Sequence, residues 1–239
     1  MNRPQPLANI RVVLSHTTHP GNIGAAARAM KTMGLRSLYL VRPRHYPDPQ
    51  ATAMAAGAAD VLDAATLCDS LEAALTDVVL AVGVTARKRD LSHPMLSARA
   101  ATPRILDTAA QFPVALVFGT EMSGLSNAEL DLCQLLLTIP AAPEYPSLNL
   151  GAAVQVIGYE MRQALPEFEL PRPLGLPPAS IDEIEGFFAH LETVLLDSGF
   201  LNPRQPKLLM RRLRRLFARA ALEKEEVNIL RGILASLRK

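Results

Sequence analysis

The sequence predicts an α/β fold with a mostly parallel sheet, followed by a small helical domain. Through residues 1–164, short apolar runs bounded by Gly and Pro alternate with helical patterns, which is typical of a parallel sheet covered on both faces. Residues 165–179 hold five prolines and no periodicity, so we expect a semi-rigid linker there. Residues 180–239 show only helical periodicity, which predicts a helical C-terminal domain that packs on the main domain or a partner.

The individual elements follow from the apolar spacing. Short apolar runs predict buried strands at residues 10–14, 37–41, 78–82, 114–118 and 135–139. One helix is expected in the Ala-rich segment that ends at Gly34. Further helices are expected at residues 50–57, 70–74 and 97–110, and after Asn149. In the C-terminal part, a capping box of Ser180 and Glu183 begins one helix. Two more are expected at residues 203–218 and 224–237.

Composition limits the function classes. The chain has 239 residues, 49% hydrophobic and 20% charged, as in ordinary globular proteins, and it lacks Trp, so stacking platforms for bases are not expected to be a major device. Cys68 and Cys133 have no metal-ligand spacing and are expected to be free thiols in a reducing cytosol. Because the sequence shows no secretory signal and no apolar stretch of spanning length, we expect a cytoplasmic protein without a membrane partner.

Positive charge is concentrated at the C-terminus. Residues 204–239 contain eleven Lys and Arg against three Glu, a net charge of +8, whereas the whole chain carries +2. The preceding residues therefore sum to −6. This asymmetry indicates an anionic partner for the tail, and RNA fits a cytosolic protein better than a membrane surface does.

The loop after the first expected strand contains Gly21, Asn22 and Gly24, and Arg28 follows on the helix. Glycines allow close approach of a ligand to the backbone, and the start of a helix offers free N–H groups to an anion. Taken alone, the loop is more simply a Gly-rich turn that only starts a helix, with Arg28 on a solvated face. A dinucleotide-binding turn fits poorly, because the third glycine and the acid after the second strand are missing.

Two later segments carry a family resemblance. The run at residues 114–118 leads into GTEMSGL, and the run at 135–139 leads into a proline-punctuated loop that ends in SLNL before a helix ending in YE. With the Asn, Gly and Arg of the first loop, these segments resemble the three motifs of the SPOUT class of RNA methyltransferases. The resemblance implies a trefoil knot, S-adenosylmethionine as the methyl donor, and a homodimer with the helix after Asn149 at the two-fold axis.

The resemblance extends over nearly the whole chain. Three further segments resemble the sequences of SPOUT enzymes that methylate the ribose 2′-oxygen of cytidine or uridine at position 32 of the tRNA anticodon loop. These segments are HPGNIGAAARAMKTMGL, FFAHLETVLLDSGF and NILRGILASL. It implies that Arg28 acts at the reacting ribose. The residues that it implies for donor binding are Val84, Thr85, Ala86, Gly119, Ile139, Pro146, Ser147 and Leu148.

Two positions depart from the family pattern. Thr120 stands where Arg is expected, and Pro146 stands where Ser is expected before Ser147. The first departure removes a possible phosphate or ribose contact, and the second stiffens the donor loop. A second hypothesis is therefore an RNA-binding protein that kept the fold and lost the chemistry. Glu121, next to Thr120, is expected to form a structural hydrogen bond across the loops and not to act as a base.

Several basic residues are candidates for RNA binding. Arg87 and Arg89, with Lys88 between them, follow a donor loop, although a solvated charge run is an equal alternative there. In the tail, helical spacing predicts an apolar side formed by Leu209, Leu213, Leu216 and Phe217. The opposite side is predicted to carry Lys207, Arg211, Arg214 and Arg215. His16 and His19 form an H-x-x-H pair, but no further ligands lie near in the sequence, so a zinc site is not expected.

Overall fold

The computed structural model describes residues 6–86, 95–165 and 177–237. Its centre is a seven-stranded sheet in which every pairing is parallel, with the strand order β3-β2-β1-β6-β4-β7-β5. The strands are β1 Ile10–Ser15, β2 Ser37–Val41, β3 Thr66–Cys68, β4 Leu80–Val84, β5 Met95–Ser97, β6 Val114–Phe118 and β7 Leu135–Thr138. The predicted parallel α/β sheet is therefore confirmed.

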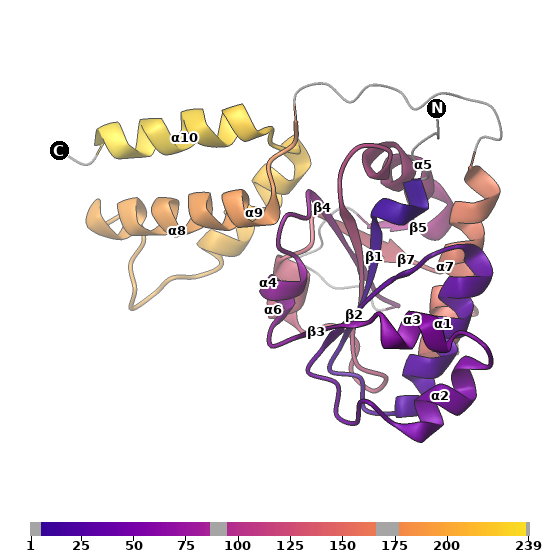
Figure 1. The fold of residues 1–239 in the computed structure, drawn as a ribbon. Coiled ribbons are helices and arrows are strands. Elements are labelled where there is room, and N and C mark those ends of the chain that lie inside the picture. Colours follow the sequence, from indigo (N-terminus) through magenta and orange to yellow (C-terminus); the bar gives the residue numbers. More distant parts are fainter. Residues whose placement is uncertain (1–5, 87–94, 166–176, 238–239) are drawn as a thin grey trace.

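Helices cover both faces of the sheet (Figure 1). The 3₁₀-helix η1 (Pro6–Asn9) precedes β1, and the helices of this part of the chain are α1 Pro20–Met33, α2 Pro49–Ala55, α3 Ala59–Asp63, α4 Leu71–Ala74, α5 Ala98–Ala109, α6 Asn127–Asp131 and α7 Leu150–Ala164. Neighbouring strand residues alternate between two cores: Val12 and Leu116 belong to the cluster under α1, α5 and α7, whereas Val13 and Val117 belong to the cluster under α4 and α6. Burial on both faces explains the continuous apolar runs.

Three further helices lie beside the sheet (Figure 1). Their buried side chains form a separate hydrophobic cluster. They are α8 Ile181–Asp197, α9 Leu209–Ala220 and α10 Lys224–Leu237, and α8 begins at the predicted capping box of Ser180 and Glu183. Their cluster centres on Phe187, Phe188 and Phe217, whose rings are 5.0–6.0 Å apart. The predicted three-helix arrangement is thus confirmed.

The three-helix unit contacts the amino-terminal edge of the sheet. The backbone N–H of Ile181 donates to the carbonyl of Val78, just before β4, at 2.8 Å. Arg211 on α9 forms an ion pair with Asp131 at the end of α6 at 3.3 Å. Because all strands are parallel, the opposite edge, where the strands end, stays clear of α8, α9 and α10.

Some element boundaries differ from the predictions. The strand predicted at residues 78–82 runs instead over Leu80–Val84, because Val78 is used for the contact with Ile181. The helix predicted to start at residue 203 begins only at Leu209, after Lys207, which has a left-handed φ of 50°. The short elements β3, β5, α3 and α6 were not predicted, because three to five residues carry too little periodicity. Most of the predicted linker, residues 166–176, lies outside the described residues.

Candidate active site

Three loops meet at the carboxyl-terminal edge of the sheet and enclose a pocket. They follow β4, β6 and β7, which are adjacent in the sheet, and ligands of open α/β sheets bind outside the carboxyl ends of strands. All eight residues predicted to bind the methyl donor line this pocket: Val84, Thr85, Ala86, Gly119, Ile139, Pro146, Ser147 and Leu148. Asn22, from the first turn of α1, lines it as well.

The loop after β6 is tightly folded on itself. The backbone N–H of Gly124 donates to the carbonyl of Thr120 at 2.9 Å, and the side chains of Thr120 and Ser123 are hydrogen-bonded at 2.7 Å. A Cβ atom at Gly119 would lie 2.2 Å from the carbonyl carbon of Gly124 and the amide nitrogen of Leu125. No side chain fits in this space, so the loop requires Gly at position 119.

The carboxylate of Glu121 connects the loops. It accepts hydrogen bonds from the backbone N–H and the hydroxyl of Thr18, the backbone N–H of His19 and the Nδ2 amide of Asn22. Burial alone would raise the pKa of Glu121, but the hydrogen bonds from Asn22 and Thr18 outweigh it and lower the pKa to about 2. Glu121 is therefore an ionised structural residue and a poor general base, as the sequence predicted.

The same network reaches the loop after β7. Asn149 donates from Nδ2 to the Oδ1 atom of Asn22 at 2.9 Å, and its own Oδ1 accepts from the backbone N–H of Gly151 at the start of α7. Asn149 is thus the N-cap of α7 and a bridge to α1. Close packing of the two helices holds the bridge, since a Cβ atom at Gly151 would lie 2.7 Å from the Cβ of Ala25.

A second polar cluster lies at the end of β1 and was not predicted. The buried Ser15 hydroxyl donates to Glu129 on α6 and is 2.9 Å from Nδ1 of His16. Burial opposes ionisation of Glu129, but hydrogen bonds from Ser15 and Ser126 lower its pKa below the usual value. The capping box of Ser126 and Glu129 was the only sequence signal that could have identified this cluster.

Arg28 does not line the pocket. It is on the exposed side of α1. Arg87 and Arg89, together with Lys88, lie outside the described residues.

Comparison with known proteins now decides the family. Residues 9–159 match the model of the SpoU rRNA methylase family. The chain belongs to that family. Residues 182–239 also match the model of the C-terminal domain of the tRNA methyltransferase TrmJ. The chain is therefore a methyltransferase whose SpoU part contains the pocket and whose TrmJ-type part contains α8, α9 and α10.

Full-length relatives agree with this assignment. The chain is 52% identical to the tRNA (cytidine/uridine-2′-O-)-methyltransferase TrmJ of Pectobacterium atrosepticum, over 98% of both chains. It is 49% identical to the tRNA (cytidine/uridine/adenosine-2′-O-)-methyltransferase TrmJ of Pseudomonas aeruginosa, over 98% of this chain and 95% of the relative. The crystal structure of TrmJ from Z. mobilis superposes with a TM-score of 0.84 and 32% identity, covering 96% of this chain and 99% of that one.

In the TrmJ-type part, α9 is oriented differently from the prediction. Arg211 pairs with Asp131, and Arg214 pairs with Glu185 at 2.7 Å while its guanidinium lies 4.4 Å from the ring centre of Phe188. Leu216, predicted to pack, is 48% exposed. Lys207 and Arg215 are exposed, as are two arginines that were not proposed, Arg212 and Arg219. The acids that balance Arg211 and Arg214 come from distant parts of the chain, so local charge counting could not identify them.

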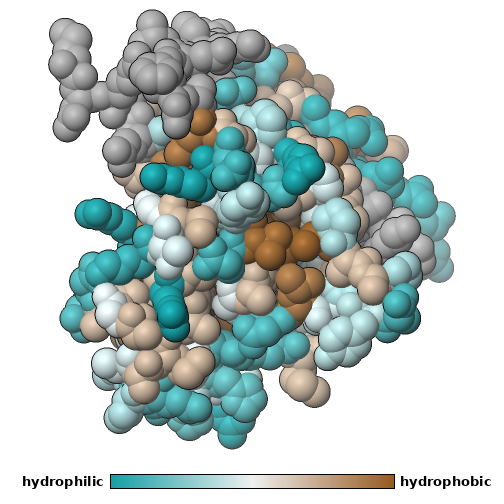
Figure 2. All heavy atoms as spheres, turned by 90° about the vertical axis from the view of Figure 1, so that its right-hand side faces the viewer, coloured by the Kyte–Doolittle hydropathy of each residue, from teal (hydrophilic) through white to brown (hydrophobic). Residues whose placement is uncertain are grey.

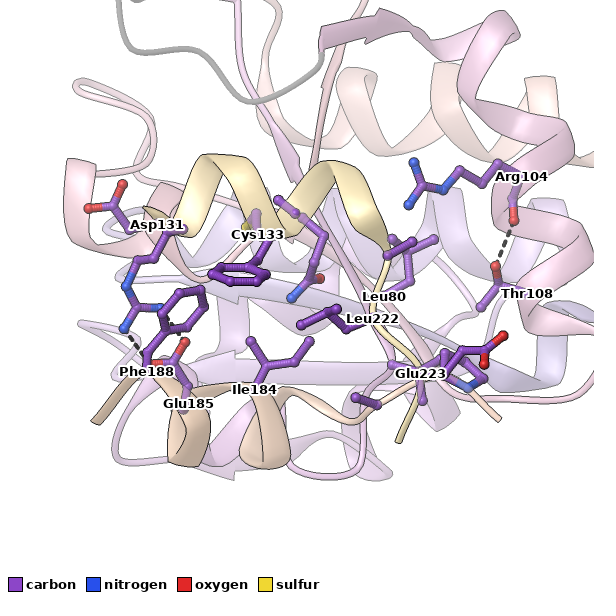
Figure 3. A pocket seen from close by; sticks show the side chains of 18 of the residues that line it. Leu80, Arg104, Thr108, Asp131, Cys133, Ile184, Glu185, Phe188, Leu222 and Glu223 are labelled. Atoms are coloured by element: carbon purple, nitrogen blue, oxygen red, sulfur yellow. Dashed lines mark hydrogen bonds and ion pairs between the residues drawn. The ribbon is translucent and has the colours of Figure 1, made fainter. Parts of the chain in front are cut away.

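A second cavity, of about 480 Å³, lies between the SpoU part and the three C-terminal helices (Figure 3). Leu80, Ile184, Phe188 and Leu222 give it apolar walls, and Glu185 lies at one side. Arg214, the ion-pair partner of Glu185, also lines it. None of the predicted donor-binding residues lines it. The cavity is therefore distinct from the candidate active site.

The described residues contain no group of three or more His, Cys, Asp or Glu that could hold a metal ion. The H-x-x-H pair of His16 and His19 accordingly has no further ligand in that part of the chain. Among the same residues, no helix has the length and apolar character required to cross a membrane.

Proposed function

We propose that this chain transfers a methyl group from S-adenosylmethionine to the ribose 2′-oxygen of cytidine or uridine at position 32 in the anticodon loop of tRNA. The observation that carries the proposal is the convergence of all eight donor-binding candidates on one pocket at the carboxyl edge of the sheet. The names of the relatives that are similar over the full length support tRNA as the substrate and the 2′-oxygen as the acceptor.

The residues around the pocket fit the proposed donor. Ile139 and Leu148 offer apolar surface for an adenine ring, and Ser147 offers a hydroxyl and backbone groups for the polar parts. S-adenosylmethionine supplies a methyl group on a sulfonium sulfur, which a nucleophile attacks in line. The chain has to bind this donor, present the ribose hydroxyl and exclude competing water.

In this proposal, Arg28 orients the ribose hydroxyl and stabilises the negative charge that develops on its oxygen. A guanidinium with a pKa of about 12 or above is a poor general base, so the proton leaves to a phosphate or to water. Because Arg28 lies outside the pocket of its own protomer, this role requires a second surface that covers the exposed face of α1.

A homodimer would supply that surface, and we propose one with α7 at the two-fold axis. Figure 2 shows hydrophobic residues gathered in the middle of the face that carries α1, α2 and α7. On α7, Val156 keeps part of its side chain accessible and Tyr159 is half exposed. A monomeric mass in sedimentation at micromolar concentration would contradict the dimer. The trefoil knot of this class and a cytoplasmic location remain part of the proposal.

The remaining basic candidates complete the proposed tRNA site. Arg87 and Arg89 follow the donor loop after β4 and are suited to phosphates near the methylated nucleotide. In the tail, Lys207 and Arg215 are free for phosphates, whereas Arg211 and Arg214 support the exposed arginines by holding α9 in place. Because α9 lies at the opposite edge of the sheet from the pocket, its arginines are suited to a region of tRNA distant from position 32.

The decisive experiment is transfer of a labelled methyl group to bulk tRNA, followed by nucleoside mapping. We expect 2′-O-methylcytidine or 2′-O-methyluridine at position 32. Absence of label from that position would overturn the proposed site of modification.

The alternative, an RNA-binding protein without activity, draws on Thr120. The hydroxyl of Thr120 forms a hydrogen bond with the hydroxyl of Ser123 within the loop. Thr120 therefore does not offer the phosphate or ribose contact that an Arg would give at this position. Calorimetric titration with S-adenosylmethionine, with and without tRNA, separates the two functions. Binding of the donor would favour the enzyme, and no heat in either titration would favour the RNA-binding protein.

A further inference from the structure

A pair of arginines lies at the same edge of the sheet as the pocket and has no role in the site described so far. Arg42 and Arg44 follow β2 and are both exposed. Among the described residues, neither guanidinium forms a hydrogen bond or an ion pair. In contrast, Arg211 forms an ion pair with Asp131, and Arg214 forms one with Glu185.

The backbone that carries these two arginines is fixed on both sides. The N–H of Arg42 donates to the carbonyl of Cys68 at 3.1 Å, and the N–H of Arg44 donates to the carbonyl of Thr17 at 3.0 Å. Arg42 also adopts a left-handed φ of 43°, which is unfavourable for a residue with a side chain and is held by these neighbours. The two guanidinium groups therefore extend from a defined platform.

Most of the carboxylates near the two arginines have other partners. His16, His19 and His45 are also exposed at this edge. The nearby carboxylates are mostly satisfied: Glu121 accepts four hydrogen bonds, Glu129 is held by Ser15 and Ser126, and Asp48 caps α2. Asp69, after β3, is exposed but forms no ion pair with either arginine. These carboxylates keep their negative charge, but Glu121, Glu129 and Asp48 are directed to other partners, so both guanidinium groups are left open to an anion from solvent.

The position of the arginines relates them to the pocket. In the sheet, β2 is next to β1 and β1 is next to β6, so the loop of Arg42 and Arg44 lies about 10 Å from the loop of Gly119 at the usual strand spacing. The contacts are also continuous: Arg44 bonds Thr17, and the neighbouring Thr18 bonds Glu121 at the pocket. Measured along the helix axis, a stacked strand advances by about 3.4 Å per phosphate, so about 10 Å corresponds to roughly three nucleotides.

We propose that Arg42 and Arg44 bind backbone phosphates of the tRNA anticodon arm, within a few nucleotides of the ribose in the active site. The inference rests on the proposed function, because it takes the RNA bound at the pocket as the ligand. Arginine suits this role, since its planar guanidinium binds phosphate oxygens in pairs. An acidic protein is the other possible partner of such a surface, but continuity with the pocket favours the RNA strand.

The test uses a double variant that carries both Arg42→Ala and Arg44→Ala, and compares it with a matched control variant. Arg36→Ala is that control, because Arg36 is exposed, is without a partner among the described residues, and lies at the opposite end of the same strand. The ligands are a full tRNA and a stem-loop with the sequence of its anticodon arm. For both ligands, we expect the double variant to raise the Kd at low salt by about tenfold or more. The slope of log Kd against log salt should fall by roughly 1 to 2.

Donor binding and the melting temperature should stay unchanged, because the lost side chains have no partners in the described part of the chain. Arg42→Lys with Arg44→Lys should keep most of the salt slope while losing the paired hydrogen bonds. Unchanged affinity of the stem-loop in the alanine double variant would overturn the proposal, as would an equal loss in Arg36→Ala. Absence of methyl transfer by the wild type, with stem-loop binding still sensitive to these arginines, would refute the proposed function and leave the phosphate site standing.

Discussion

The Nδ2 amide of Asn22 donates to the Oε1 atom of Glu121 at 2.9 Å, across 99 positions of sequence. Asn22 belongs to the helix after β1, and Glu121 belongs to the loop after β6. Asn149 donates a hydrogen bond to Asn22 in turn. Through Asn22, these two hydrogen bonds join the three segments that carry the family motifs. The shape of the candidate pocket therefore depends on a carboxylate that does not itself have to react.

We predict that Glu121→Gln lowers the free energy of unfolding at pH 7 by about 2 kcal/mol, as expected for loss of charge-assisted hydrogen bonds. The amide keeps one oxygen acceptor, but its NH₂ group faces donors from Thr18, His19 or Asn22. Urea denaturation of both proteins measures the difference. A variant as stable as the wild type at pH 7 would show that the network is dispensable.

The pH dependence of this difference has a defined sign. The folded pKa of Glu121 is about 2, below its usual value of 4.5, so its stabilisation is fully present above pH 4.5. It is lost as the pH falls from 4.5 toward 2. The stability difference between wild type and Glu121→Gln should therefore shrink over that range. Other carboxylates, including Glu129, titrate in both proteins, so their contributions largely cancel in the comparison.

We predict that Gly119→Ala abolishes donor binding and lowers the melting temperature. The new Cβ would meet backbone atoms of Gly124 and Leu125 at 2.2 Å, and backbone cannot move aside as a side-chain end can. Gly232→Ala on α10 is the matched control, since nothing lies within 4 Å of its added Cβ. Calorimetric titration and thermal melting of both variants test the contrast. Normal donor affinity in Gly119→Ala would show that the loop opens at little cost.

For Arg28→Ala, we predict loss of turnover with donor affinity within a few-fold of the wild type. The reason is its position, because Arg28 is exposed on α1 and does not line the pocket proposed for the donor. Single-turnover methyl transfer and donor titration give the two quantities separately. If donor affinity collapsed together with turnover, Arg28 would have a role in donor binding or folding, and the proposed action at the ribose would be wrong.

Much of the fold could be predicted because the sheet is buried on both faces. Apolar runs such as Val114–Phe118 have no polar residues to obscure them, and the caps Ser180 and Asn149 mark helix starts. The edge strand β3 was missed because Thr66 and Leu67 are exposed, so no core imposes a pattern on it. The strand at Leu80–Val84 was placed two residues early, because Val78 is apolar for its place in the core and not as part of the strand.

The candidate site was predictable in part. The pocket residues were found through the family motifs, which lie on loops that have no periodic signal of their own. The bonds from Ser15 to Glu129 and from Asn149 to Asn22 join residues more than 100 positions apart, so spacing along the chain could not reveal them. The same limit applies to Arg211 and Arg214, whose acidic partners are 80 and 29 positions away.

The contacts of Arg214 lead to a prediction about stability. Arg214→Ala removes the ion pair with Glu185 and the cation–π contact with Phe188. Both partners belong to α8, so we expect a loss of about 1–2 kcal/mol from these partly buried contacts. Arg219→Ala is the control, because Arg219 is exposed on the same helix and without a partner among the described residues. Equal stability of the two variants in urea denaturation would contradict the structural role of Arg214.

The exposed arginines of α9 lead to the last prediction. Arg212, Arg215 and Arg219 recur every three or four residues, so they form one stripe on the solvent side of the helix. A stripe of unpaired charge attracts phosphates by releasing counterions, whatever the RNA sequence.

We therefore predict that Arg212→Glu with Arg215→Glu raises the Kd for full tRNA by tenfold or more at low salt and flattens its salt dependence. Donor binding should be unchanged, because the stripe and the pocket lie at opposite edges of the sheet. For the same reason, affinity for the isolated anticodon stem-loop should change little, in contrast to the variants of Arg42 and Arg44. Comparing the two ligands in filter binding over a range of salt makes the distinction. If the double variant bound full tRNA as tightly as the wild type, the stripe would be only a solvated face of α9.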